Sequence, residues 1–261
     1  MEFKIYQVDA FTNKLFGGNP AAVCPLKEWL TDELMQKIAS ENNLSETAYY
    51  VPKGEEFELK WFTPKAEINL CGHATLAASF VIFEIEKSKQ PVLKFHTRSG
   101  ILSVSKSRKG YTMNFPADVF NKTNVTDEII HAIGIKPSDV FLGRNILMVV
   151  LSSEEELINI VPDHQKIKQL HPHGLIVTAK GKNSDFVSRC FFPNFGIDED
   201  PVSGSAHTIL TPYWAQRLKK NVLTARQLSQ RKGELICKLE NDRVAISGEA
   251  VLYMTGNILI L

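Results

Sequence analysis

The order of apolar and polar residues along the chain predicts many short strands and few helices. Apolar and polar residues alternate, or apolar residues gather in short β-branched runs, in segments such as 3–11, 57–62 and 92–97. Helical periodicity is found in Thr31–Asn42, Ala74–Ile85, Asp127–Ile133 and His207–Leu218, and more weakly in Ser153–Ile160 and Ala225–Gln230. Turn residues separate most strands, and the helices do not alternate with them regularly. We therefore expect an α+β fold with largely antiparallel sheets.

A pattern of strand, proline turn, acidic spacer and helix occurs twice, about half the chain apart. The first copy is WFTPKAEINLCGHATLAASF (61–80), and the second is RCFFPNFGIDEDPVSGSAHTILTPYWAQRL (189–218). Each copy leads a Gly-X-Ala motif into a helix, and the second has a spacer three residues longer. Repetition of this kind predicts a duplicated domain. We expect an N-terminal half of 1–116, a C-terminal half of 117–249, and a last strand of about 250–261 that returns to the first half.

The helix expected from Ala74 is apolar on nearly every side. Only Thr75, Ser79 and Glu84 are left for solvent. A helix that is apolar all round is buried on all sides, so each half is expected to be a sheet curled around a central helix. In the second copy, Pro212 predicts a kink or an early end of the helix.

Composition narrows the choice of partners and cellular location. A chain of 261 residues can form one large domain or two smaller domains with cores of their own. With 30 basic and 29 acidic residues, the net charge of +1 gives no reason to expect nucleic acid or an anionic membrane. No apolar run reaches the roughly 18 residues that span a bilayer, and the N-terminus has a strand pattern rather than that of a signal peptide. The four cysteines are widely spaced and no metal-ligand spacing is found, so we expect a reduced, cytoplasmic protein without a metal site.

The two helix starts are the first candidates for chemistry. Free N–H groups and the helix dipole at Gly72 and Gly204 favour an anion, such as a carboxylate or enolate held in a cleft between the halves. His73 and Ser205 occupy matching positions and would line that cleft; otherwise the glycines merely start helices and Ser205 is an N-cap. Asp200, in the inserted spacer, would orient an imidazole or a substrate amine, or is simply a turn residue before a proline.

Glu46 is the candidate general base. It lies where the helical segment 31–42 gives way to a strand, in the sequence SET (45–47), among apolar neighbours. A carboxylate in an apolar setting can have a raised pKa suited to proton abstraction. The alternative is an exposed glutamate in an ordinary loop.

Four ordered segments resemble the PhzF (phenazine biosynthesis PhzF-like) family, which shares its fold with diaminopimelate epimerase. They are YQVDAFTNKLFGGNPAAV (6–23), NLSETAYYV (43–51), LKWFTPKAEINLCGHATLAASFVIF (59–83) and FFPNFGIDEDPVSGSAHTILTPYWAQRL (191–218). The resemblance implies two pseudo-symmetric halves with the active site between them. It also implies isomerisation without a cofactor, by proton transfer on a small carboxylate substrate, as in phenazine biosynthesis. A homodimer is plausible for such a family.

The resemblance also assigns roles to individual residues. The catalytic glutamate, histidine and aspartate of the family fall on Glu46, His73 and Asp200. The substrate-binding segments match Ser45, Gly72, Gly204 and Ser205.

Cys71 lies where epimerase relatives carry one of two catalytic thiols, whereas Ser203 stands at the second. We therefore expect an isomerase with Glu46 as its base. For Cys71, we prefer the role of a bystander thiol to that of a single acid or base. An amino-acid racemase or epimerase that uses Cys71 is one alternative, and a non-catalytic protein that binds a ligand or partner is another. LFGGNP (15–20) does not fit the dinucleotide fingerprint, in agreement with a mechanism without a nucleotide cofactor.

Overall fold

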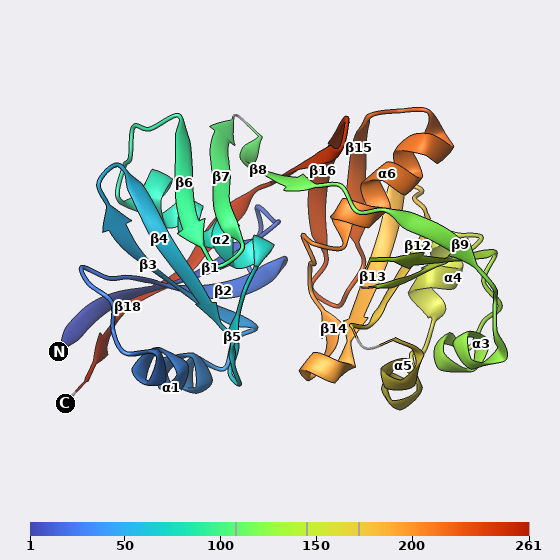
Figure 1. Ribbon diagram of the computed structural model, residues 1–261, viewed down its shortest axis with the longest axis horizontal. Coiled ribbons are helices and arrows are strands. Elements are labelled where there is room, and N and C mark those ends of the chain that lie inside the picture. Colours follow the sequence, from blue (N-terminus) through green and yellow to red (C-terminus); the bar gives the residue numbers. More distant parts are fainter. Residues whose placement is uncertain (108, 145, 172, 261) are drawn as a thin grey trace. The chain divides into compact units, whose positions relative to one another are not determined.

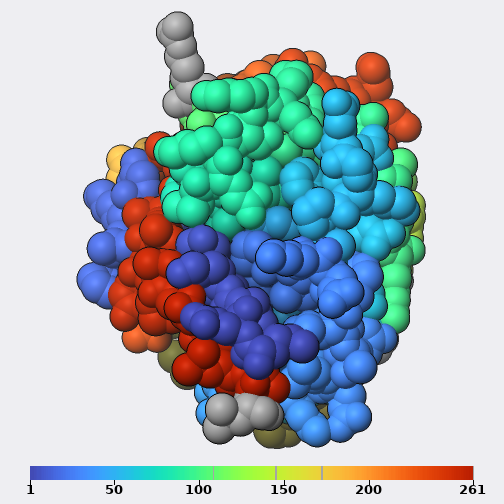
Figure 2. Space-filling view, turned by 90° about the vertical axis from the view of Figure 1, so that its left-hand side faces the viewer, coloured from blue at the N-terminus to red at the C-terminus, as the bar shows by residue number. Residues whose placement is uncertain are grey.

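A computed structural model describes residues 1–107, 109–144, 146–171 and 173–260. The chain divides into two compact units, Met1–Asn114 with Ser247–Leu261, and Phe115–Ile246. In the first unit the last strand, β18 (Ala250–Leu259), pairs antiparallel with the first strand, β1 (Glu2–Ala10). The two ends of the chain consequently lie side by side, and Figure 2 shows the red C-terminal strand against the blue N-terminal strand.

The elements of each unit are as follows (Figure 1). The first unit further contains β2 (Asn19–Pro25), α1 (Asp32–Asn42), β3 (Glu46–Lys53), β4 (Glu56–Phe62), β5 (Glu67–Ile68), α2 (Gly72–Phe80), a π-helical turn (Val81–Ile85), β6 (Val92–Thr97), β7 (Gly100–Ser107) and most of β8 (Gly110–Pro116). The second contains β9 (Phe120–Thr123), α3 (Asp127–Ile133), β10 (Asp139–Gly143), β11 (Leu147–Val150), α4 (Glu154–Asn159), α5 (His164–Leu170), β12 (Leu175–Lys180), β13 (Phe186–Phe192), a 3-10 turn (Pro193–Phe195), β14 (Ile197–Asp200), α6 (His207–Leu218), β15 (Val222–Gln227), β16 (Gly233–Glu240) and most of β17 (Arg243–Gly248).

Both units pair their strands in the same way. In the first, β2 is parallel to β3, β3 is antiparallel to β4, β4 is parallel to β6, and β6 is antiparallel to β7. In the second, β11, β12, β13, β15 and β16 repeat this series. The duplication expected from the sequence is thus confirmed, and the sheets are mostly antiparallel with two parallel pairs at matching places.

Helix α2 is the buried centre of the first unit. It packs against β1, β2, β3 and β18, and Figure 1 shows it among the strands. The expectation that Thr75 and Ser79 face solvent is wrong, because both side chains are fully buried. Their hydroxyls donate to the carbonyls of Cys71 (2.5 Å) and Thr75 (2.8 Å), so the helix itself satisfies them. The periodic segment predicted up to Ile85 changes at Val81 into the π-helical turn.

Helix α6 occupies the matching place in the second unit, and Pro212 does not end it. Proline lacks an N–H, so the carbonyl of Thr208 loses its usual partner within the helix. The backbone N–H of Asp118 donates to that carbonyl instead, at 3.0 Å. A partner from outside the helix thus offsets the lost bond, and the predicted early end was wrong because α6 continues to Leu218.

Two further expectations about helices differ from the structure. The weak helix predicted at Ala225–Gln230 is wrong, because the first half of this segment belongs to β15, which is paired with β13 and β16 on its two sides. Helix α5 was not predicted; it begins after Asp163, whose side chain accepts from the N–H groups of Gln165 and Lys166. Within the described part of the chain, every helix is too short or too polar to cross a bilayer.

Candidate active site

The first unit brings Glu46, His73 and Cys71 together. Glu46 is the first residue of β3, where it lies beside Ala21 in the parallel strand β2. His73 is the second residue of α2, and its Nε2 lies 2.9 Å from Oε2 of Glu46. Glu46 is 6% exposed and His73 is 5% exposed. Glu46 is therefore not an ordinary loop glutamate but a buried carboxylate in contact with an imidazole.

The other ring nitrogen of His73 also has neighbours. Nδ1 lies 3.5 Å from Sγ of Cys71 and 3.2 Å from Nδ2 of Asn19. The imidazole thus stands between a carboxylate on its Nε2 side and a thiol and an amide on its Nδ1 side. Sequence reasoning did not single out Asn19, although its segment, GGNP, belongs to a conspicuous turn.

That turn places Asn19 at the start of β2. Gly18 has φ of +62°, and a Cβ there would lie 2.1 Å from the carbonyl oxygen of Ala10, so only glycine fits without strain. Asp9 accepts a hydrogen bond from the N–H of Phe16 at 3.0 Å, which holds the preceding residues of the turn. A glycine followed by a buried asparagine is the signal that points to this position.

Burial and charge set the protonation of the cluster. Burial raises the pKa of the Cys71 thiol, the charge of Glu46 adds to this rise, and His73 opposes it. Burial alone would lower the pKa of His73, but Cys71 and Glu46 outweigh it and hold that pKa well above its ordinary value. Near neutral pH the raised pKa of Cys71 keeps its thiol neutral, so the Glu46 carboxyl is the neighbouring charge that favours an imidazolium.

The same three side chains carry atoms that commonly bind metal ions. Donor atoms from Glu46, Cys71 and His73 all lie within 4.8 Å of one another. However, the thiol is at Nδ1 and the carboxylate is at Nε2, and the lone-pair directions of these two nitrogens diverge. One ion can bind only one of the nitrogens. The arrangement therefore suits separate polar contacts on the two sides of the ring better than a shared metal ion.

The second unit holds Asp200 in a polar network of its own. Asp200 ends β14, is 9% exposed, and accepts a hydrogen bond from Oγ of Ser203. Gln227, fully buried on β15, donates to the carbonyl of Asp200 at 2.7 Å and accepts from the N–H of Ser203 at 2.9 Å. Asp200 is thus more than a turn residue before a proline. Nothing in the local sequence pointed to Gln227, because its contacts lie more than twenty residues away.

Gly204 and Ser205 do not match their counterparts in α2 fully. Gly72 starts α2, but Gly204 and Ser205 lie in a turn before α6, which begins only at His207. The carbonyls of Gly204 and Ser205 accept from the N–H groups of His207 and Thr208, each at 3.1 Å. Ser205 is exposed and is not the N-cap, so the expectation of two equivalent helix starts was wrong in detail.

Ser45, the last of the predicted site residues, directly precedes β3 and is half-buried. The predicted sites consequently fall into two groups, one in each unit. Glu46, His73 and Cys71 are in contact in the first. That both groups serve one substrate stays a prediction.

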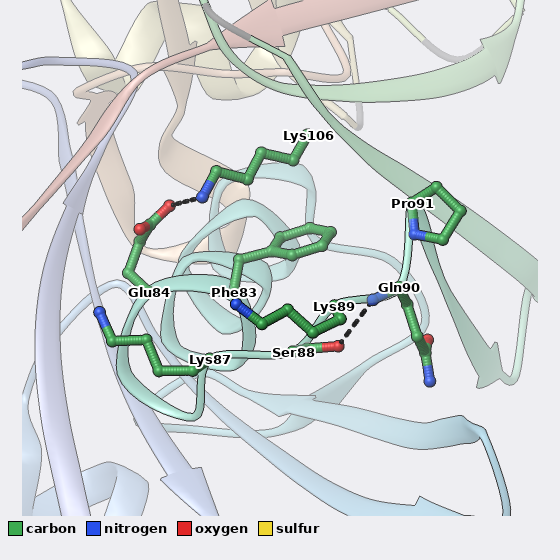
Figure 3. A pocket seen from close by; sticks show the side chains of 8 residues that line it. All are labelled: Phe83, Glu84, Lys87, Ser88, Lys89, Gln90, Pro91 and Lys106. Atoms are coloured by element: carbon green, nitrogen blue, oxygen red, sulfur yellow. Dashed lines mark hydrogen bonds and ion pairs between the residues drawn. The ribbon is translucent and has the colours of Figure 1, made fainter.

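A separate open pocket of about 470 Å³ lies at the far end of the helix that carries His73. Figure 3 shows Lys106 turned toward Glu84, with Lys87 and Lys89 around the same hollow. Lys106 pairs with Glu84 at 2.6 Å. None of the predicted site residues lines this pocket, so it is not the candidate active site.

Comparisons with known proteins show the family and the fold of the chain. The family model described as phenazine biosynthesis-like protein (PhzC-PhzF) matches residues 8–256. An uncharacterized isomerase of Pseudomonas aeruginosa is 50% identical over 258 residues, which are 99% of each chain. The crystal structure of a PhzF-family phenazine biosynthesis protein of Enterococcus faecalis is 46% identical, covers both chains fully and has a TM-score of 0.97. A predicted epimerase of Pseudomonas aeruginosa, 19% identical with 99% and 100% of the two chains covered, shares the fold with a TM-score of 0.76.

Proposed function

The chain belongs to the phenazine biosynthesis-like (PhzC-PhzF) family, and on that premise we propose that it is a cofactor-independent isomerase that moves a proton on a small, carboxylate-bearing substrate. The observation that carries the proposal is the buried contact of 2.9 Å between Glu46 and His73. A carboxylate and an imidazole in contact are the side chains that most often transfer protons in enzymes.

Glu46 is the base in this proposal. Its carboxylate takes a proton from a carbon next to an activating group: the C–H bond breaks, an O–H bond forms, and the electron pair passes into the conjugated system of the substrate. The same carboxyl then returns the proton to another carbon, so atoms and charge balance. Nε2 of His73 lies 2.9 Å from Oε2 of Glu46, and this ion-pair contact keeps the carboxyl in place between the two steps.

The start of α2 is the proposed anchor for the substrate carboxylate. The N–H groups of the first helical turn lack partners within the helix, and the positive end of the dipole favours an anion there. The side chain at the N-cap position, Cys71, makes no capping hydrogen bond. Ser45, Asp200, Gly204 and Ser205 are proposed as the remaining substrate contacts.

Solvent-isotope exchange tests the proposal without a known substrate. The protein would be incubated with a panel of small carboxylates in deuterated water, and mass spectrometry would search for label in each compound. We expect Glu46→Gln to slow labelling by about two or more orders of magnitude, the usual weight of general acid–base catalysis. Glu56→Gln is the matched control, because Glu56 also pairs with a histidine, His96, at a half-buried place outside the candidate site. Equal labelling by wild type and Glu46→Gln would remove Glu46 from the mechanism.

An amino-acid racemase or epimerase is the second candidate, favoured by the position of Cys71 beside His73. Such an enzyme would need a second acid on the opposite face of the substrate. The matching residue, Ser203, already donates its hydroxyl to Asp200. Loss of all exchange in Cys71→Ser, with label found only at Cα of an amino acid, would favour this candidate over the first.

A further inference from the structure

Two polar groups share the Nδ1 side of His73, and they differ in what they can do. Asn19 is fully buried and presents its Nδ2 at 3.2 Å. An amide N–H can only donate, so this orientation suits a ring whose Nδ1 is bare. Cys71 presents a thiol at 3.5 Å. Because a thiol is both a weak donor and a weak acceptor, it suits Nδ1 with or without a proton.

The charge of that ring can change during the proposed reaction, because Glu46 loses its own negative charge when it takes the substrate proton. His73 is charged when both nitrogens carry protons, and it is neutral whenever Nε2 or Nδ1 has lost one. The amide N–H of Asn19 can only donate, so a ring that carries a proton on Nδ1 would repel it unless the buried amide group rotated by 180°. Rotation of the thiol hydrogen of Cys71 about the Cβ–Sγ bond lets the thiol pair with either form, so the amide does not need to rotate.

From these contacts we propose that Cys71 is a positioning residue for His73. Its thiol accepts from Nδ1–H in the charged ring and donates to Nδ1 in the neutral ring. The ring thereby keeps its place, with Nε2 toward Glu46, through a catalytic cycle. The inference rests on the proposed function, in which Glu46 takes and returns the proton while His73 holds its carboxyl. It replaces the expectation that Cys71 is a bystander.

The depth of the site makes the thiol suitable for this role. Cys71 is 6% exposed, and its raised pKa keeps it protonated, so it does not compete with Glu46 for the substrate proton. Cys24, in the same unit, is also buried but belongs to the apolar cluster between α1 and its sheet. The two thiols thus differ in their neighbours rather than in their burial.

The test follows His73 by NMR in protein labelled with ¹⁵N-histidine, with the signal assigned by its loss in His73→Gln. A hydrogen bond to a charged group is about twice as strong as one between neutral groups, so the thiol favours the charged ring by about 0.4 to 1 unit of pKa. We expect Cys71→Ala to lower the titration midpoint of His73 by about this amount. Cys71→Ser, which keeps a rotating donor and acceptor, should restore it, and Cys24→Ala should leave it unchanged.

The outcomes separate the positioning role from its alternatives. An unchanged midpoint in Cys71→Ala, or a Cys71→Ser protein that titrates like Cys71→Ala, would overturn the inference. If Cys71→Ala does not fold, Cys71→Ser decides alone: a wild-type midpoint supports the role and a lowered one refutes it. None of these readouts needs a substrate. A failure of Glu46→Gln to slow exchange would therefore refute the proposed function without altering the titration result.

Discussion

Replacement of His207 by asparagine is expected to remove a pH dependence of stability that burial of this ring creates. His207 is fully buried, and burial lowers its pKa from 6.5 to about 4, although the carbonyl of Ser203, which accepts from Nδ1 at 2.8 Å, opposes the shift. In the unfolded chain the ring would titrate near 6.5. Between these two values the unfolded state binds more protons than the folded state, so stability falls as the pH falls.

The size of the effect follows from the two pKa values. A shift from 6.5 to about 4 implies that the folded protein loses about 2 kcal/mol of unfolding free energy between about pH 7 and pH 5 through this one residue. His73 contributes with the opposite sign, because its raised pKa adds stability that is present at low pH and lost as the pH rises through the folded value. Only a comparison with a variant therefore isolates His207.

Urea denaturation of wild type and His207→Asn at both pH values measures this difference. Trp214, the tryptophan of the second unit, is 2% exposed and stacks on Phe186, which also contacts the His207 ring, so its fluorescence reports unfolding near the substitution. The variant loses stability at both pH values because it leaves a cavity, and only the difference between the two pH values is informative. If wild type and variant lose the same stability on acidification, the buried neutral histidine is not the cause.

Two further substitutions test how the second unit is held. Gln227→Leu leaves the carbonyl of Asp200 and the N–H of Ser203 without their partner, and we expect about 2–4 kcal/mol of lost stability in urea denaturation; a loss below about 1 kcal/mol would contradict the bridging role. At Gly174 φ is +120°, and a Cβ would lie 2.2 Å from a backbone oxygen. We therefore expect Gly174→Ala to lower the melting temperature more than Gly54→Ala, because nothing lies within 4 Å of a Cβ at Gly54. An equal decrease in melting temperature for the two variants would show that the backbone around Gly174 moves to relieve the clash.

Local patterns predicted those parts of the fold that local chemistry decides. The bounds of α3 agree with the prediction, and α1 begins directly after its capping residue, Thr31, whose side chain accepts from the N–H of Leu34. Periodicity also placed the buried helix α2. The contact between Glu46 and His73 could be anticipated only through the family resemblance, because 27 positions separate the two residues and the sheet alone brings them together.

The missed features share a different physical origin, which is a partner distant in sequence. Asn19 reaches His73 because β2 lies beside β3, and Gln227 reaches Asp200 because β15 lies beside β13. Pro212 is tolerated because the N–H of Asp118 takes the carbonyl that the proline leaves free. No local pattern encodes such contacts, since each depends on the register of a sheet or on a connecting segment.

The matching strands of the two units show where the halves diverge. β3 and β12 correspond, because each is parallel to the strand before it and antiparallel to the strand after it. In the first unit Thr47 lies opposite Phe62, two residues before a proline; in the second, Leu175 lies opposite Phe191, also two residues before a proline. Thr47 is preceded by Glu46 in the first unit, and Leu175 is preceded by Gly174 in the second. Glu46 and Gly174 therefore occupy corresponding positions.

Gly174 leaves no room for a base in the second half. Its φ of +120° and the close backbone oxygen exclude a side chain at the position that corresponds to Glu46. Ser203, which corresponds to Cys71, donates its hydroxyl to the carboxyl of Asp200. Epimerisation by two bases needs an acid or base on each face of the substrate, whereas return of a proton by the group that removed it needs only one. Among the described residues, the buried Glu–His contact lies in the first unit, and this asymmetry supports the proposal that Glu46 both takes and returns the proton.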